Sequence, residues 1–128
     1  MDGLGIVMQR IAAIQGIADQ VARGAMIINS TVDTREFVEQ ICEIKGIGEW
    51  TAYYIAMRAL NDPNAFPYSD LILRRALNVD EELTARKLLK RSEVWQPWRA
   101  YSAILLWKNY GATLNQKAKK ITRKRKNI

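Results

Sequence analysis

The residues of this sequence most able to do chemistry are two closely spaced glycines and one carboxylate downstream of them. Gly46 and Gly48 stand two positions apart, between an apolar helix end and a new helical pattern. This predicts a hairpin whose backbone can approach another molecule closely. If the next helix begins at Glu49 or Trp50, its free N–H groups suit a phosphate. Asp70 follows one helix later. The spacing indicates a protein that grips a nucleic-acid backbone and does chemistry beside it.

Aromatic residues follow the hairpin at helical spacing. Trp50 and Tyr54 are one turn apart, so both rings can point at the same ligand, and such rings attract a cation by roughly 0.5–2 kcal/mol. Asp70 follows Ser69, which can cap a short helix. A carboxylate at a helix start is favoured as the ion and can stabilise a developing cation or orient a water. The alternatives are a capping role for Asp70 and a core role for the aromatic rings.

Composition excludes several classes of site. The chain has 128 residues, of which 48% are hydrophobic and 26% charged, as expected of an ordinary globular domain. No apolar run approaches the roughly 18 residues of a membrane span and no signal peptide is visible, so we expect a cytoplasmic protein with no membrane partner. The single cysteine, Cys42, excludes an intrachain disulfide and a four-cysteine iron–sulphur site. Because histidine is absent, a Ser-His-Asp triad and histidine-ligated metals are excluded.

The net charge of +7 is concentrated at one end of the chain. Residues 115–128 contain seven basic residues and no acid, whereas residues 1–114 contain 13 basic and 13 acidic residues. Such a run is typical of a solvated, disordered tail. It can add salt-sensitive attraction to phosphate, but a localisation signal or simple solubility explains it equally well.

The hydrophobic pattern predicts an all-α domain of about six helices over residues 1–114. The first helix ends at Gly24, and its apolar stripe consists of Val7, Ile11, Ile14, Ala18 and Val21. Further helices are expected from an Asp33 or Thr34 cap to Ile44, over 49–61, 70–77 and 81–93, and from Pro97 to just before Gly111. The segment 25–28 is a short candidate strand.

Three motifs carry a more specific resemblance. They are Gly46-Ile47-Gly48-Glu49-Trp50-Thr51-Ala52, Phe66-Pro67-x-x-Asp70 and Trp95-Gln96-Pro97-Trp98-Arg99-Ala100-Tyr101. Together they resemble the helix-hairpin-helix superfamily of DNA glycosylases, and most closely its alkylation-repair branch of the 3-methyladenine DNA glycosylase II type. The likeness runs from about Leu4 to Gly111.

The resemblance implies a role for each matching position. Asp70 corresponds to the catalytic aspartate, and Trp50, Tyr54 and Trp107 to the aromatic pocket that holds the flipped base. The DNA backbone is held at Gly46, Ile47, Gly48 and Thr51. The backbone carbonyls of Cys42, Ile44 and Ile47 ligate a monovalent cation, Na⁺ or K⁺, and no other cofactor is required.

Two departures from the family pattern refine the expectation. Members that also cut the DNA strand carry a nucleophilic lysine where this chain has Trp50, which excludes a Schiff base at that position. Leu71 stands where close relatives have a tyrosine. The chain also begins where the family's catalytic domain is already half built. We therefore expect exposed apolar surface and either self-association or a separate N-terminal half as partner.

The sequence therefore predicts a monofunctional DNA N-glycosylase of base excision repair, or its C-terminal catalytic portion. Its expected substrate is double-stranded DNA with alkylated purines such as 3-methyladenine, extruded before cleavage. Two alternatives stay open. One is a non-catalytic DNA-binding module that keeps only the hairpin, and the other is a fragment that needs an N-terminal partner.

Overall fold

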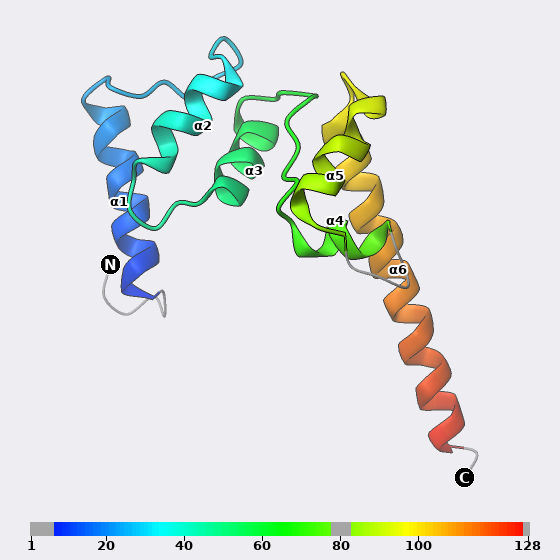
Figure 1. Cartoon of the computed structure of the whole chain (residues 1–128). Coiled ribbons are helices and arrows are strands. Elements are labelled where there is room, and N and C mark those ends of the chain that lie inside the picture. Colours follow the sequence, from blue (N-terminus) through cyan, green and yellow to red (C-terminus); the bar gives the residue numbers. More distant parts are fainter. Residues whose placement is uncertain (1–6, 78–82, 127–128) are drawn as a thin grey trace. The chain divides into compact units, whose positions relative to one another are not determined.

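The computed structural model describes the backbone of residues 7–77 and 83–126, with side chains as far as Gln116. Every regular element in these ranges is a helix, as predicted, and none is a strand (Figure 1). The chain divides into two compact units, Met1–Pro67 and Tyr68–Ile128, here called the N-terminal and C-terminal units. The sequence analysis had expected one helical domain over residues 1–114.

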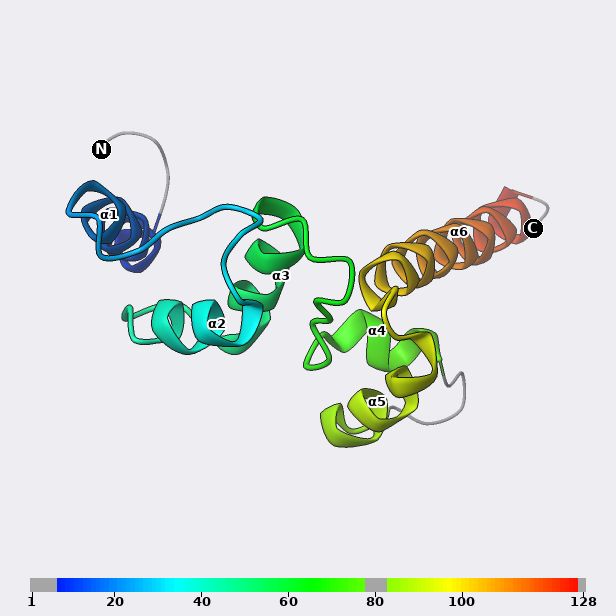
Figure 2. The same cartoon turned by 90° about the horizontal axis from the view of Figure 1, so that it is seen from above.

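The N-terminal unit consists of α1 (Met8–Ala22), α2 (Thr34–Cys42) and α3 (Glu49–Ala59). Helices α2 and α3 pack side by side as the two arms of a hairpin (Figure 2). Their contact buries Phe37 and Ile41 of α2 and Ala52 and Ala56 of α3. Helix α1 packs closely on the turn between them, since a Cβ built on Gly16 would lie 2.7 Å from Cγ2 of Ile44. The hairpin is thus fixed from one side by α1.

The predicted apolar stripe of α1 is only partly buried. Ile11 is buried, but Val7, Ile14, Ala18 and Val21 are exposed. The buried face runs instead through small residues, Ala13 and Gly16, which let α1 approach the hairpin turn. The periodicity of large residues identified the helix correctly but selected the wrong face, because close packing of two backbones requires small side chains rather than large ones.

The ends of the first two helices follow from local chemistry. Gly24, with φ +69°, follows α1, and the Asp33 carboxylate caps α2 by accepting from the N–H groups of Arg35 and Glu36 at 2.9 and 3.1 Å. The segment 25–28 is not a strand. Its N–H groups at Ala25 and Met26 bond to the Gln20 carbonyl instead, and the Gln40 side chain donates to the Ala25 carbonyl at 2.6 Å.

The C-terminal unit consists of α4 (Leu71–Ala76), α5 (Ala85–Arg91), the 3₁₀ helix η1 (Ser92–Trp95) and α6 (Arg99–Lys126). Helix α4 packs on α5 and α6, and η1 contacts both α5 and α6. The core of the unit contains Leu73, Leu88 and Ala103, all fully buried. Figure 1 shows that α6 continues well past α4 and α5.

Three predicted boundaries in this unit differ from the structure. The predicted helix 81–93 is shorter and ends in the 3₁₀ turn, and its first two residues lie outside the described residues. Helix α6 starts two residues after Pro97 and runs through Gly111 to Lys126, so 115–126 is helical rather than disordered. One glycine costs a helix only about 1 kcal/mol, and the neighbouring alanine, leucine, glutamine and lysine residues are strong helix formers. Despite its length, neither α6 nor any other described helix is apolar enough to span a membrane.

Candidate active site

The hairpin turn joins Cys42, the last residue of α2, to Glu49, the first residue of α3. The turn is closed by the N–H of Ile47, which donates to the carbonyl of Ile44 at 3.0 Å. The side chain of Ile47 is buried and anchors the turn. This confirms the predicted joint between the helices, with α3 beginning at Glu49.

Helix α3, like α1, starts without a side-chain cap, whereas three other helices are capped. Asp33, Asp70 and Thr84 cap α2, α4 and α5 with their own side chains. Helix α3 has Gly48 at its N-cap position and receives no side-chain cap. The N-terminal end of a helix carries orphan N–H groups and a partial positive charge. An uncapped start in this position suits an external anion such as a phosphate.

The two glycines of the turn have different reasons to be glycine. Gly46 has φ +95°, and a Cβ there would lie 3.4 Å from both the Ala13 Cβ and the Gln9 carbonyl oxygen. The fold itself therefore requires Gly46. Gly48 has an ordinary φ of −100°, and a Cβ there would meet nothing within 4 Å. Since the protein leaves this space open, only an outside molecule would need Gly48 to be small.

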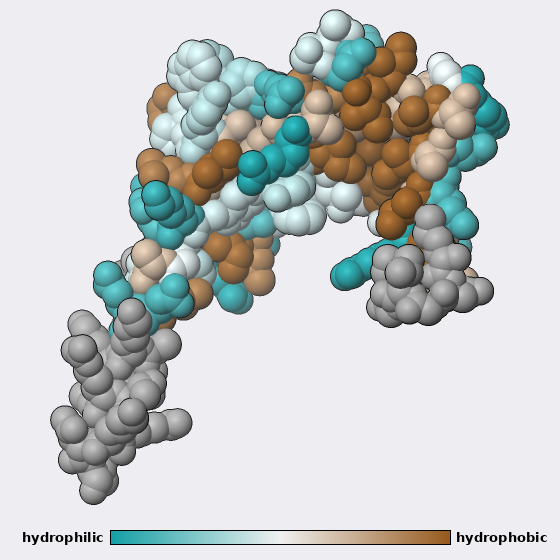
Figure 3. All heavy atoms as spheres, turned by 180° about the vertical axis from the view of Figure 1, so that it is seen from behind, coloured by the Kyte–Doolittle hydropathy of each residue, from teal (hydrophilic) through white to brown (hydrophobic). Residues whose placement is uncertain are grey.

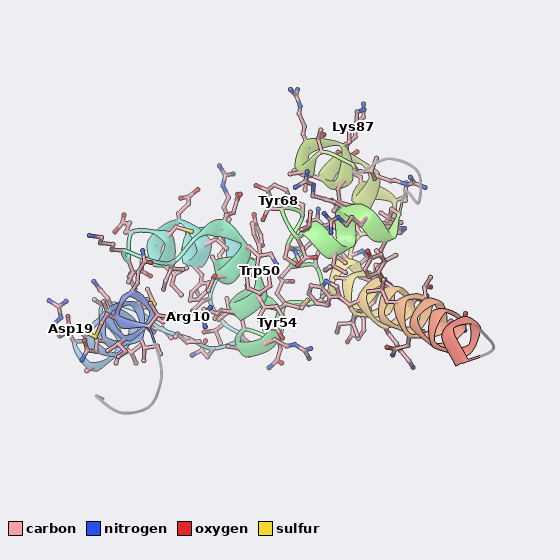
Figure 4. The ribbon with its side chains drawn as sticks, turned by 90° about the horizontal axis from the view of Figure 1, so that it is seen from below. Arg10, Asp19, Trp50, Tyr54, Tyr68 and Lys87 are labelled. Atoms are coloured by element: carbon pink, nitrogen blue, oxygen red, sulfur yellow. The ribbon has the colours of Figure 1, made fainter. Side chains whose placement is uncertain are left out.

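Trp50 and Tyr54 are brought together on one face of α3, as predicted (Figure 4). Their ring centroids are 5.3 Å apart and the rings are nearly parallel, at 17°. The Arg58 guanidinium lies 5.7 Å from the Tyr54 centroid and extends the row by one more turn. Trp50 is 41% exposed, which leaves indole surface open to a planar ligand. Thr51, half-buried, lies beside this pair in the first turn of α3.

Asp70 is buried and caps α4. One of its oxygens, Oδ1, accepts two hydrogen bonds, from the Leu73 N–H at 2.8 Å and from the Trp107 indole N–H at 3.1 Å. The sequence predicted Ser69 as the cap, with a capping role for Asp70 as the alternative, and the structure shows Asp70 as the cap. Two donors from different elements fix the orientation of the carboxylate.

Trp107 has a role that sequence reasoning missed. It was predicted as a wall of the base pocket, whereas the structure shows its indole nitrogen donating to Asp70 across 37 positions of sequence. No local spacing indicates such a long-range pair. Trp107 is half-buried on α6, so part of its ring is also exposed. The structure thus joins Asp70 to Trp107 in the C-terminal unit, and Trp50 to Tyr54 beside the hairpin in the N-terminal unit.

The predicted cation ligands are three carbonyl oxygens of the hairpin. Cys42 ends α2, and the last carbonyls of a helix have no partner within it. The Ile44 oxygen accepts from Ile47 but keeps a second lone pair. Neutral oxygen donors of this kind fit a hard monovalent cation. The Cys42 sulphur is a poor ligand, because burial and, less strongly, the charge of Glu49 raise the pKa of its thiol. Among the described residues no cluster of three histidine, cysteine or carboxylate side chains could hold a metal ion.

No family model matches the chain, but several known proteins are similar to it in sequence. The chain is 34% identical over 114 residues to a probable bifunctional transcriptional activator/DNA repair enzyme AlkA of Mycobacterium tuberculosis, a match covering 88% of this chain and 23% of that protein. It is 32% identical over 101 residues to a DNA-3-methyladenine glycosylase of Bacillus subtilis, with 74% and 33% covered.

A solved structure is similar over most of the chain. The 3-methyladenine DNA glycosylase Mag1 of Schizosaccharomyces pombe, in complex with abasic DNA, matches with a TM-score of 0.74 and 28% sequence identity. The match covers 81% of this chain and 54% of that one. The chain thus spans about a quarter to a third of the two curated relatives and about half of this neighbour.

Proposed function

Because the chain belongs to the helix-hairpin-helix family of DNA glycosylases and corresponds to their C-terminal part, we propose that it is a monofunctional DNA N-glycosylase. Its substrates are alkylated purines such as 3-methyladenine in double-stranded DNA, removed in base excision repair. The observation that carries the proposal is that Asp70 is a buried carboxylate oriented by two N–H donors, and the resemblance to the family matches this residue to the catalytic aspartate.

Asp70 acts on the sugar in this proposal. The bond between C1′ and the base nitrogen breaks, and its electron pair neutralises the positive charge of the alkylated purine. The sugar becomes an oxocarbenium-like cation, which a nearby carboxylate stabilises. A water oxygen then bonds to C1′, and its proton passes to the Asp70 carboxylate or to solvent. Since the cationic base is already a good leaving group, the chemistry needs no histidine to act as a general acid.

The aromatic row of α3 holds the extruded base. A cationic purine is planar, and stacking on an indole with a cation–π contribution favours it over a neutral base. Trp50 offers the more exposed ring and Tyr54 stacks behind it. In the C-terminal unit, the partly exposed ring of Trp107 lies beside the carboxylate that it orients.

The hairpin holds the DNA backbone. The uncapped start of α3 and the open space at Gly48 allow the N–H groups of residues 48–51 to approach a phosphate. A monovalent cation held by the carbonyls of Cys42, Ile44 and Ile47 would add positive charge to this anchor. These contacts read no sequence, as suits a protein that must bind DNA wherever damage occurs.

The exposed apolar face of α1 supports a protein partner, either a second copy of the chain or a separate N-terminal half. Val7, Ile14 and Val21 are exposed on this helix, and Figure 3 shows apolar side chains gathered over one face of the N-terminal unit. Burying apolar surface contributes roughly 25 cal/mol per Å². Light scattering at rising concentration should detect association, and Ile14→Lys should weaken it. A clean monomer with full activity would contradict this part of the proposal.

The decisive experiment measures base release. A duplex with one 3-methyladenine is incubated with the chain alone and with the N-terminal part of a relative, which lies outside the match, supplied in trans. Release of the base, leaving an abasic site on an unbroken strand, supports the proposal. If the chain binds the duplex through the hairpin but releases no base in either mixture, it is a DNA-binding module instead.

A further inference from the structure

The exposed side of α5 carries four basic residues and no acid. Arg86, Lys87, Lys90 and Arg91 are all exposed, while Leu88 on the opposite side is fully buried. Their spacings of three and four residues place them on one face of the helix, here called the α5 basic face. Figure 4 shows Lys87 extending away from the helix.

The α5 basic face is not explained by the stability of the helix. Arg86 and Lys90, like Lys87 and Arg91, form like-charge pairs four residues apart, which destabilise a helix. Arg86 and Lys87 also stand in the first turn, where the helix dipole disfavours cations. Only the two basic residues of the last turn are favoured there.

Among the residues that the structure describes, these four charges have no ion-pair partner. In the N-terminal unit, Arg23 pairs with Asp19 and Arg35 with Glu39. Within the part of the chain that the structure describes, none of the four α5 residues makes such an ion pair. Four cations on one face of a helix that itself carries no carboxylate favour an external polyanion.

The net charges of the two units also favour a DNA-binding surface in the C-terminal unit. Residues 1–67 contain five basic and eight acidic residues, whereas residues 68–128 contain 15 basic and five acidic residues. The unit with the hairpin therefore has a formal charge of −3, and the other unit one of +10. Long-range attraction of DNA must come from the C-terminal unit, whereas the sequence pattern had indicated only the tail as a possible source of it.

We propose that the α5 basic face is a second phosphate-binding surface, which holds the backbone of duplex DNA in addition to the hairpin. The choice of DNA rests on the proposed function. From position 86 to 91 the helix rises about 7.5 Å, and a DNA strand carries one charge per about 3.4 Å of axis. The face therefore matches two to three successive phosphates.

The test measures binding of the full chain to an undamaged duplex by fluorescence anisotropy between 50 and 200 mM salt. Replacing Arg86, Lys87 and Lys90 together by Gln keeps long side chains and helix propensity. Each lost phosphate contact reduces the slope of log K against log salt by about 0.9. We expect the slope to decrease in magnitude by about 2 and the affinity at 0.1 M salt to fall about 60-fold.

A matched control removes the same charge elsewhere. Replacing the exposed Arg10, Arg23 and Arg35 of the N-terminal unit by Gln also lowers the net charge by three. A slope that changes only in the α5 variant supports the proposal. Equal changes in both variants, or none in the α5 variant, overturn it.

Two further measurements cover misfolding and a different ligand. The charge-preserving set Arg86→Lys, Lys87→Arg and Lys90→Arg should keep the wild-type slope, and losing it overturns the proposal. A larger loss of affinity for duplex RNA than for duplex DNA would assign the face to RNA and overturn it as well. Because the DNA is undamaged, a chain that releases no base can still pass this test, so the proposed function and this inference fail separately.

Discussion

Replacing Asp70 by Asn should abolish base release while preserving the fold and the binding of DNA. Both observed hydrogen bonds to this side chain end on Oδ1, one from Leu73 and one from Trp107. The amide oxygen of asparagine can accept both, and asparagine caps helices about as well as aspartate. The substitution therefore removes the negative charge while keeping an acceptor for these two hydrogen bonds.

The expected effects on the rate, on the stability and on DNA binding follow from the loss of the negative charge. Loss of electrostatic stabilisation at the reacting centre costs about 3 kcal/mol or more, which is a reduction in rate of at least about 100-fold at 1.36 kcal/mol per factor of ten. The free energy of unfolding should change by less than about 0.5 kcal/mol, because the cap is retained. The DNA dissociation constant should stay within a few-fold, since Asp70 makes no phosphate contact in this proposal.

The assay is single-turnover release of 3-methyladenine from a defined duplex, with thermal unfolding measured on the same samples. Asp33→Asn provides the matched control, because it is the same substitution at the N-cap of another helix. The control should retain the wild-type rate. If Asp70→Asn releases the base within a few-fold of the wild-type rate while folded, the carboxylate has no part in the reaction and the reasoning is refuted.

Three further predictions follow from the hairpin and α3. Gly48→Ala should weaken DNA binding about tenfold without loss of stability, because only an outside molecule needs that space, whereas Gly46→Ala should lower the free energy of unfolding by about 1–2 kcal/mol because Gly46 has a positive φ. Thermal melts measure the stability of each variant, and fluorescence anisotropy measures its affinity for DNA. Wild-type affinity in a folded Gly48→Ala variant would contradict the phosphate contact. Borohydride should trap no covalent adduct with DNA, because Trp50 cannot form a Schiff base, and a trapped adduct would reveal another amine nucleophile. Burial and, secondarily, the charge of Glu49 raise the pKa of the Cys42 thiol above its ordinary 9.0. The contribution of the protonated thiol to stability is therefore present below pH 9 and is lost as the pH rises through the folded-state pKa. Iodoacetamide labelling of the folded chain should reach its midpoint at a higher pH than labelling of the unfolded chain.

Local signals in the sequence were sufficient to predict the helices and most of their ends. Asp33 and Gly24 were identified as boundaries because capping and positive φ depend only on neighbouring residues. The hairpin and the pairing of Trp50 with Tyr54 follow from spacing within one helix in the same way.

The features that the sequence did not predict depend on contacts between distant residues. The buried face of α1 is defined by Ala13 and Gly16, whose small size matters only once the hairpin turn is in place. Trp107 reaches Asp70 through the packing of α6 on α4. The α5 basic face was hidden for a different reason. The net charge of residues 1–114 is zero because the acidic surplus of the N-terminal unit offsets the basic surplus of the other unit, so the sum does not reveal the basic face.

The capping pattern distinguishes structural from functional demands in this fold. A helix start needs partners for its N–H groups, and α2, α4 and α5 satisfy this need with Asp33, Asp70 and Thr84. Helices α1 and α3 have no such side chain, but only at α3 does a glycine with open space around it hold the N-cap position, where a serine or aspartate would fit without strain. Such a cap would occupy the N–H groups and place an oxygen where the phosphate must come. Glycine in place of a capping side chain costs a helix only about a few tenths of a kcal/mol, so α3 can keep its start open for DNA at little loss of stability.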